Sequence, residues 1–136
     1  MRVGFIYTSP FPAKRGFSAA DRRVRDLVRG LHKAGVETFL LVPRYHAKAS
    51  LDSNIEEYPI EYVGSYVFGK LTLINRLFFW FAVLRYVVRN NIDTLILYNT
   101  QADSVLFSYF LKARGIKIVT EICDLHSNSD KFNLKA

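Results

Sequence analysis

Apolar positions along this chain fall into short continuous runs that alternate with stretches of helical spacing. Residues 3–8 form an apolar run that stops at a Ser-Pro-Phe-Pro sequence, which is typical of a strand buried on both faces. A helix is then expected from Ser18, with Asp21 as the second member of a capping box. Its apolar positions recur at i, i+3, i+4 and i+7, at Val24, Leu27, Val28 and Leu31. Gly35 is the expected C′ residue of this helix.

Predicted strands and helices continue to alternate as far as residue 122. Further strands are predicted at 36–42, 60–63, 93–99 and 116–122, and helices at 71–88 and 103–114. The stretch 44–57 is polar and aperiodic. Strands that alternate with helices predict an α/β fold, a Rossmann-like doubly wound parallel sheet of about five strands with helices on both faces. The expected strand order is 3-2-1-4-5.

The predicted helix 71–88 is apolar nearly all round and carries four consecutive aromatic residues at 78–81. Its core-facing side is expected to hold Leu71, Ile74, Leu77, Phe78, Phe81 and Leu84 or Arg85. Apolar residues on the opposite side need a second partner, which is another domain, another subunit or a lipid surface. We assign Phe79, Trp80 and Val83 to that interface.

This helix is not expected to span a membrane. Asn75, Arg76 and Arg85 interrupt it and leave an uncharged run of eight residues, 77–84, whereas a spanning helix needs roughly 20 apolar residues. The first residues also lack a signal-peptide cleavage site. The chain has one cysteine, Cys123, so no intramolecular disulfide is expected. A reducing cytoplasm is the default location.

Length and composition indicate one folded domain, residues 1–136. Half of the residues are hydrophobic and 23% are charged, unlike a disordered chain. The net charge of +7 is uneven, because seven basic residues and two acidic ones lie between Lys14 and Lys33. One face near the first predicted helix should therefore be strongly positive, which suits a phosphorylated substrate, anionic lipid or nucleic acid. Nucleic acid is not expected, since the aromatic residues are not interleaved with Lys or Arg on a sheet face.

Ligands of doubly wound sheets bind beyond the C-terminal ends of the strands. There the predicted fold places the loop 9–18, the turn 98–101 and the turn 123–126. In the first loop Gly16 permits close approach of a ligand, and the helix that follows favours an anion. Lys14, Arg15 and Phe17 complete a candidate acceptor or phosphate site. Alternatively, Gly16 only forms the turn and the two basic side chains are solvated.

The other two turns supply polar candidates. Asn99 and Thr100 follow the strand at 93–99, and Asp124 and His126 follow the last strand. A carboxylate beside an imidazole can orient hydroxyls or exchange protons, so Asp124 is the candidate catalytic residue and His126 a binding residue. The alternative is an N-cap aspartate and a surface histidine.

The sequence lacks the motifs of three other classes of protein: dinucleotide-binding enzymes, P-loop proteins and structural metal-binding proteins. A dinucleotide fingerprint needs three spaced glycines, and a P-loop needs a Gly-Lys-Ser/Thr ending; neither occurs. A structural metal site needs about four ligands, and Cys123 and His126 are not joined by another cysteine or by clustered histidines. No metal is expected.

The motifs taken together resemble glycosyltransferase family 4. The opening strand, Pro10-Phe11-Pro12 with Gly16, the run 21–24 and the helix end 31–38, Leu-His-Lys-Ala-Gly-Val-Glu-Thr, are similar to the start of that family's N-terminal domain. The segment 91–99 resembles the family's Asp-Val-Ile-His strand. The segment 115–125 resembles its strand leading to His-Asp or His-Glu. The resemblance covers most of the chain.

This resemblance implies one half of a GT-B enzyme. The N-terminal, acceptor-side domain would bind a glycan or lipid-linked acceptor, and a C-terminal domain, which the chain lacks, would bind the nucleotide sugar. No cofactor is implied beyond that donor substrate. The chain alone should be inactive and should bind nucleotide sugar only with a donor-domain subunit. It departs from the family pattern in having one glycine instead of two, Cys123 in place of a histidine, and Asn99 near the strand-end histidine.

A second hypothesis assigns the chain a docking function instead of a catalytic one. In this hypothesis the chain is a non-catalytic subunit of a split glycosyltransferase that docks on a partner or peripherally on the inner face of a membrane. The aromatic run and the arginines of the first helix, notably Arg22 and Arg25, motivate this hypothesis.

Overall fold

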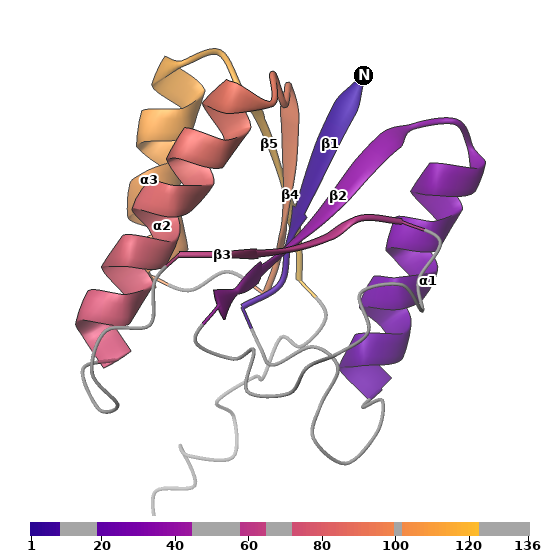
Figure 1. Ribbon diagram of the computed structural model, residues 1–136, viewed down its shortest axis with the longest axis horizontal. Coiled ribbons are helices and arrows are strands. Elements are labelled where there is room, and N and C mark those ends of the chain that lie inside the picture. The colour runs from indigo at the N-terminus through magenta and orange to yellow at the C-terminus, as the bar shows by residue number, and fades with distance from the viewer. Residues whose placement is uncertain (9–18, 45–57, 65–71, 100–101, 123–136) are drawn as a thin grey trace, which may run out of the picture.

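The computed structural model describes residues 1–8, 19–44, 58–64, 72–99 and 102–122. In these residues the strands are β1 (Arg2–Ile6), β2 (Glu37–Pro43), β3 (Ile60–Val63), β4 (Thr94–Tyr98) and β5 (Lys117–Glu121). The helices are α1 (Ala19–Lys33), α2 (Thr72–Arg89) and α3 (Ala102–Ala113). Neighbouring strands are parallel and follow the order β3-β2-β1-β4-β5 (Figure 1). The predicted fold class and strand order are confirmed.

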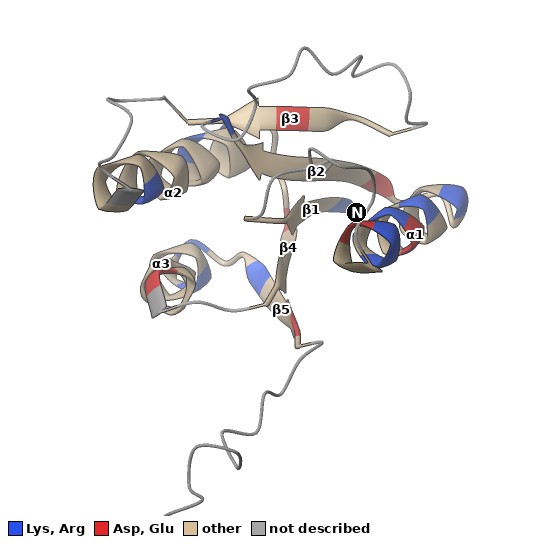
Figure 2. Cartoon of the chain, turned by 90° about the horizontal axis from the view of Figure 1, so that it is seen from below, with Lys and Arg blue, Asp and Glu red and all other residues tan. Residues whose placement is uncertain are grey.

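The helices cover both faces of the sheet, with α1 on one face and α2 and α3 on the other (Figure 2). Side chains of a strand point alternately to the two faces. Phe5 and Leu40 accordingly pack in the core under α1, whereas Ile6 and Leu41 pack under α2 and α3. Both faces of β1 and β2 are therefore covered, which explains the continuous apolar runs in their sequences.

All three helices end in the same hydrogen-bonded motif. At the end of α1, Gly35 has a φ of 80°, its N–H donates to His32, and the N–H of Val36 donates to Leu31. This is a Schellman ending, and it confirms Gly35 at C′. Gly115 after α3 and Asn91 after α2, with φ of 79° and 51°, make the equivalent pairs of hydrogen bonds.

The predicted orientation of α2 is wrong. Phe79, Trp80 and Val83, which we assigned to an outer interface, are buried against the sheet and α3. Leu77, Phe78 and Phe81, which were expected in the core, are exposed. Ile74 and Arg85 are exposed as well, whereas Leu84 is half-buried and packs against the core. Leu71 lies outside the described residues.

Two polar side chains explain this error. Asn75 is buried, and Arg76 lies on the side of α2 that faces α3, where it binds an aspartate. A sequence pattern assigns such residues to the solvent side of a helix. Because α2 is apolar on its other sides too, its hydrophobic periodicity did not determine which side packs on the sheet.

Candidate functional site

The chain leaves β1, β4 and β5 at a single edge of the sheet, which we call the C-terminal edge and define by Thr8, Asn99 and Ile122. β1 and β4 are paired in parallel through Ile6 and Leu97, and β4 and β5 through Tyr98 and Glu121. At the tips of the last two strands, the N–H of Asn99 donates to the Glu121 carbonyl over 2.9 Å. The prediction that β1, β4 and β5 end at one edge is confirmed, whereas the turns that follow them are largely outside the described residues.

Most predicted site residues belong to those turns and lie outside the described residues. They are Lys14, Arg15, Gly16, Phe17, Thr100, Asp124 and His126. Asn99 is described, and it is exposed at the tip of β4 with a φ of 52°. This left-handed backbone is a conformation that asparagine tolerates better than most residues. Arg22 is exposed and Arg25 half-buried on α1.

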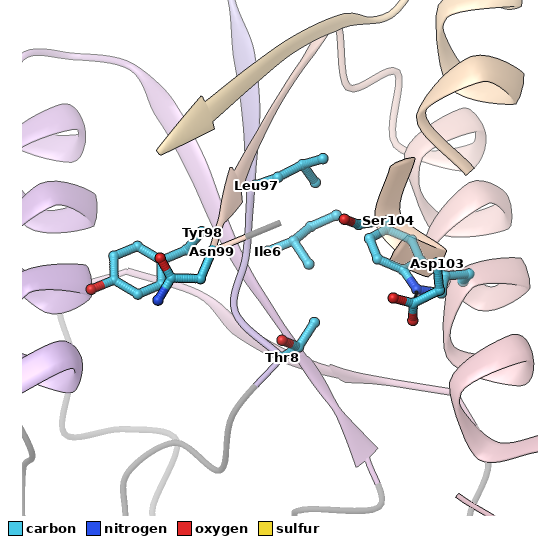
Figure 3. A pocket seen from close by; sticks show the side chains of 8 residues that line it. Ile6, Thr8, Leu97, Tyr98, Asn99, Asp103 and Ser104 are labelled. Atoms are coloured by element: carbon cyan, nitrogen blue, oxygen red, sulfur yellow. Dashed lines mark hydrogen bonds between the residues drawn. The ribbon is translucent and has the colours of Figure 1, made fainter. Parts of the chain in front are cut away.

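A small pocket opens at the C-terminal edge between β1, β4 and the first turn of α3 (Figure 3). Its lining includes Thr8, Asn99, Trp80, Asp103 and Ser104. The pocket holds about 10 Å³, which is room for about one water molecule. A pocket of this volume is too small for a sugar ring, so a larger ligand at this edge would need contacts beyond these residues.

Asp103 makes three side-chain hydrogen bonds beside this pocket. Its carboxylate accepts two hydrogen bonds from the Arg76 guanidinium, at 2.9 and 2.6 Å, and one from the Trp80 indole N–H at 2.8 Å. A bidentate arginine pair of this kind is stronger than a single neutral hydrogen bond. Asp103 also stands in the first turn of α3, where the helix dipole favours a negative charge.

The chemistry of Asp103 is that of an anchor. Burial raises its pKa, but the hydrogen bonds from Arg76 and Trp80 and the positive charge of Arg76 outweigh burial, so the pKa lies below its ordinary value. A general acid or base near neutral pH needs the opposite shift. Asp103 therefore stays ionised and joins α2 to α3. The sequence contained no signal for this pairing, because Arg76 and Asp103 are 27 residues apart.

On the other face, a second polar group ties α1 to the same edge. The Tyr7 hydroxyl donates to the buried Asp21 carboxylate over 2.8 Å, and the Tyr7 ring packs edge-on against Tyr98 at 5.4 Å between centroids. Arg23 pairs with Glu121 at 2.8 Å. The start of α1 is thus attached to β1 and β5. Sequence reasoning had given Asp21 only a capping role and had missed Tyr7.

Within the described part of the chain, no three His, Cys, Asp or Glu side chains come together as metal ligands. Its helices include none that is both long enough and apolar enough to cross a bilayer.

Sequence comparisons identify no relative: no model of a protein family matches, and no curated protein matches. Among solved structures, the fold is similar to MurG of Acinetobacter baumannii, a GT-B glycosyltransferase, with a TM-score of 0.62 and 12% sequence identity. The likeness covers 89% of this chain and 34% of that chain. The chain thus spans about a third of the length of that protein, and the two share a fold: a five-stranded parallel sheet with helices that matches one half of a GT-B enzyme.

Proposed function

We propose that this chain is the acceptor-binding N-terminal domain of a GT-B glycosyltransferase. The observation that carries the proposal is the C-terminal edge, where β1, β4 and β5 all end. Ligands of such sheets bind at this edge. The likeness of the fold to one half of MurG supports the GT-B part of the proposal, and the motifs that resemble family 4 favour that family.

We assign binding and catalytic roles to the residues that follow β1, β4 and β5 in the sequence. Lys14, Arg15, Gly16 and Phe17 contact the acceptor or its phosphate, and basic side chains beside a helix start suit such an anion. Asn99, Thr100 and His126 bind acceptor hydroxyls, and Asp124 is the candidate catalytic carboxylate. The nucleotide sugar is the donor and is bound mainly by a second domain, so the chain alone does not transfer sugar.

Acceptor binding can be tested without that second domain. Isotope-labelled chain is titrated with octyl glucoside below its micelle concentration, as a sugar on an alkyl chain, and with glucose 1-phosphate. Amide shifts are expected at Thr8, Asn99 and Ile122, on the C-terminal edge. The opposite edge, marked by the helix ends at Gly35, Asn91 and Gly115, should be unchanged. Shifts confined to that opposite edge would contradict the proposed site.

A pair of asparagine variants sharpens the test. Asn99 and Asn91 both have positive φ, 52° and 51°, and glycine adopts this backbone readily. Asn99→Gly should remove a contact and weaken binding of the probe, whereas Asn91→Gly should leave it unchanged. Calorimetry with a UDP-sugar should detect no binding. Tight binding of the UDP-sugar by the chain alone would overturn the division of the site between two domains.

A further inference from the structure

Exposed apolar side chains gather on one side of the molecule. Of the thirteen large hydrophobic residues that are exposed in the described chain, ten lie on α2 and α3. We call this the α2/α3 outer surface: Leu73, Ile74, Leu77, Phe78, Phe81, Val88, Val105, Leu106, Tyr109 and Phe110. Its two halves are joined, because the rings of Phe81 and Phe110 both contact the buried Phe107, at 5.4 and 6.1 Å between centroids. A surface of this kind usually has a partner.

In the described residues, the charged side chains of α2 and α3 that make no ion pair are all basic. α2 has no acidic residue, and the one acidic residue of α3, Asp103, is bound to Arg76. Arg85, Arg89, Lys112 and Arg114 make no ion pair that the described residues show. A shallow groove of about 450 Å³ combines both properties, since it is lined by Phe81, Leu84, Val88, Arg85, Arg89 and Arg114. Its partner should be apolar and anionic.

We propose that the α2/α3 outer surface docks the protein on a bilayer that contains anionic lipid. Apolar side chains of an interfacial helix enter the boundary between headgroups and acyl chains, while neighbouring arginines remain at the anionic headgroups. A second copy fits less well, because facing copies would bring Arg85, Arg89 and Arg114 of each chain together. This docking does not require sugar transfer and stands independently of it.

The proposal relocates the membrane contact that the sequence indicated. Arg22 and Arg25 are on α1, which covers the opposite face of the sheet (Figure 2). Phe79, Trp80 and Val83 are in the core. The proposed contact instead uses the ends of α2 and α3 where Arg89 and Arg114 lie, together with the exposed side of both helices.

Vesicle flotation of the full chain tests the docking. The vesicles are phosphatidylcholine alone, or equal parts of phosphatidylcholine and phosphatidylglycerol. Binding is expected to the anionic vesicles at low salt and should weaken as salt is added. Arg85→Gln with Arg89→Gln should weaken binding roughly 30-fold, since each basic residue near an anionic surface strengthens binding about fivefold. The matched control is Arg22→Gln with Lys33→Gln on α1, which removes the same charge and should change binding little.

A second pair of variants tests the apolar contribution. Val88 and Val119 are similarly exposed, 47% and 50%, but Val119 is on β5, away from the groove. Val88→Ser should weaken vesicle binding roughly tenfold, and Val119→Ser should not. Melting temperatures of all variants verify folding. If Val88→Ser unfolds the chain, the variant with Arg85→Gln and Arg89→Gln still tests the docking.

Three results would overturn the proposal. The first is no binding to anionic vesicles at low salt. The second is equal loss of binding in the two charge variants, which would indicate general attraction of a basic protein. The third is self-association by sedimentation that Val88→Ser abolishes, without vesicle binding, because the surface would then contact a second copy.

Discussion

Trp80 on α2 donates its indole N–H to the carboxylate of Asp103 on α3 across 2.8 Å, while its ring stacks on Phe107 at 5.7 Å between centroids. Trp80 is 1% exposed, so its N–H depends on this partner. Asp103 also holds Arg76. One aspartate therefore accepts three hydrogen bonds from two side chains of α2 and sets the first turn of α3 beside the C-terminal edge.

Replacing Trp80 tests this junction. Trp80→Phe keeps an aromatic ring but removes the donor and some buried volume, and should lower the free energy of unfolding by about 2 to 4 kcal/mol. Urea unfolding measures the change. Tyr109→Phe is the control, because Tyr109 is exposed on α3, and it should alter stability by less than about 0.5 kcal/mol. Equal stability of the two variants would contradict the anchoring role.

The lowered pKa of Asp103 predicts a pH dependence of stability. Its carboxylate form is favoured in the folded state by Arg76 and Trp80 against the effect of burial. The stabilisation is thus present above the unfolded pKa of about 3.9, and it is lost as pH falls through the lower folded pKa. Unfolding free energies measured from neutral to acid pH should show this loss.

Asp103→Asn provides the comparison for that profile. The variant keeps a hydrogen-bond acceptor but has no charge, so it should be less stable than the wild type at neutral pH. The difference between the two proteins should shrink as the wild-type carboxylate is protonated. A constant difference across the acid range would show that Asp103 does not carry the dependence.

Two glycine positions offer a matched pair. A Cβ at Gly4, in the centre of β1, would lie 2.6 Å from Leu95 Cδ2, whereas a Cβ at Gly30 in α1 meets nothing within 4 Å. Gly4→Ala should destabilise the protein by about 1 to 3 kcal/mol through overpacking. Gly30→Ala should stabilise it by about 0.5 to 1 kcal/mol through helix propensity. Thermal melting distinguishes them, and an unchanged or raised melting temperature for Gly4→Ala would refute the close packing of β1 on β4.

The hydrogen bond from Tyr7 to Asp21 should help to hold α1 on its face of the sheet. Tyr7→Phe removes the hydroxyl that donates to the buried Asp21 side chain and should cost about 1 to 3 kcal/mol, because a buried acceptor loses a donor. Hydrogen exchange should show faster opening of α1 than in the wild type. If exchange in α1 is unaltered, the contact does not hold that helix to the sheet.

The elements of the fold could be predicted because their signals are local. Apolar runs before Pro10 and Pro43, the spacing of Val24 and Val28, and the glycine after α1 each report on neighbouring residues. Alternation of strands and helices then limited the strand order to few choices. For the candidate site, the same reasoning predicted the edge but not the contacts at its base.

What the sequence determined by itself is therefore the set of elements, their order in the sheet and the edge at which β1, β4 and β5 end. The tertiary structure alone decided which side of α2 is buried, and it paired Arg76 and Trp80 with Asp103 and Tyr7 with Asp21. The physical reason is that helices and strands are set by the spacing of apolar residues that are close together in the sequence. The packing side of an all-round apolar helix, and a partner for a buried charge, depend on side chains that are distant in the chain.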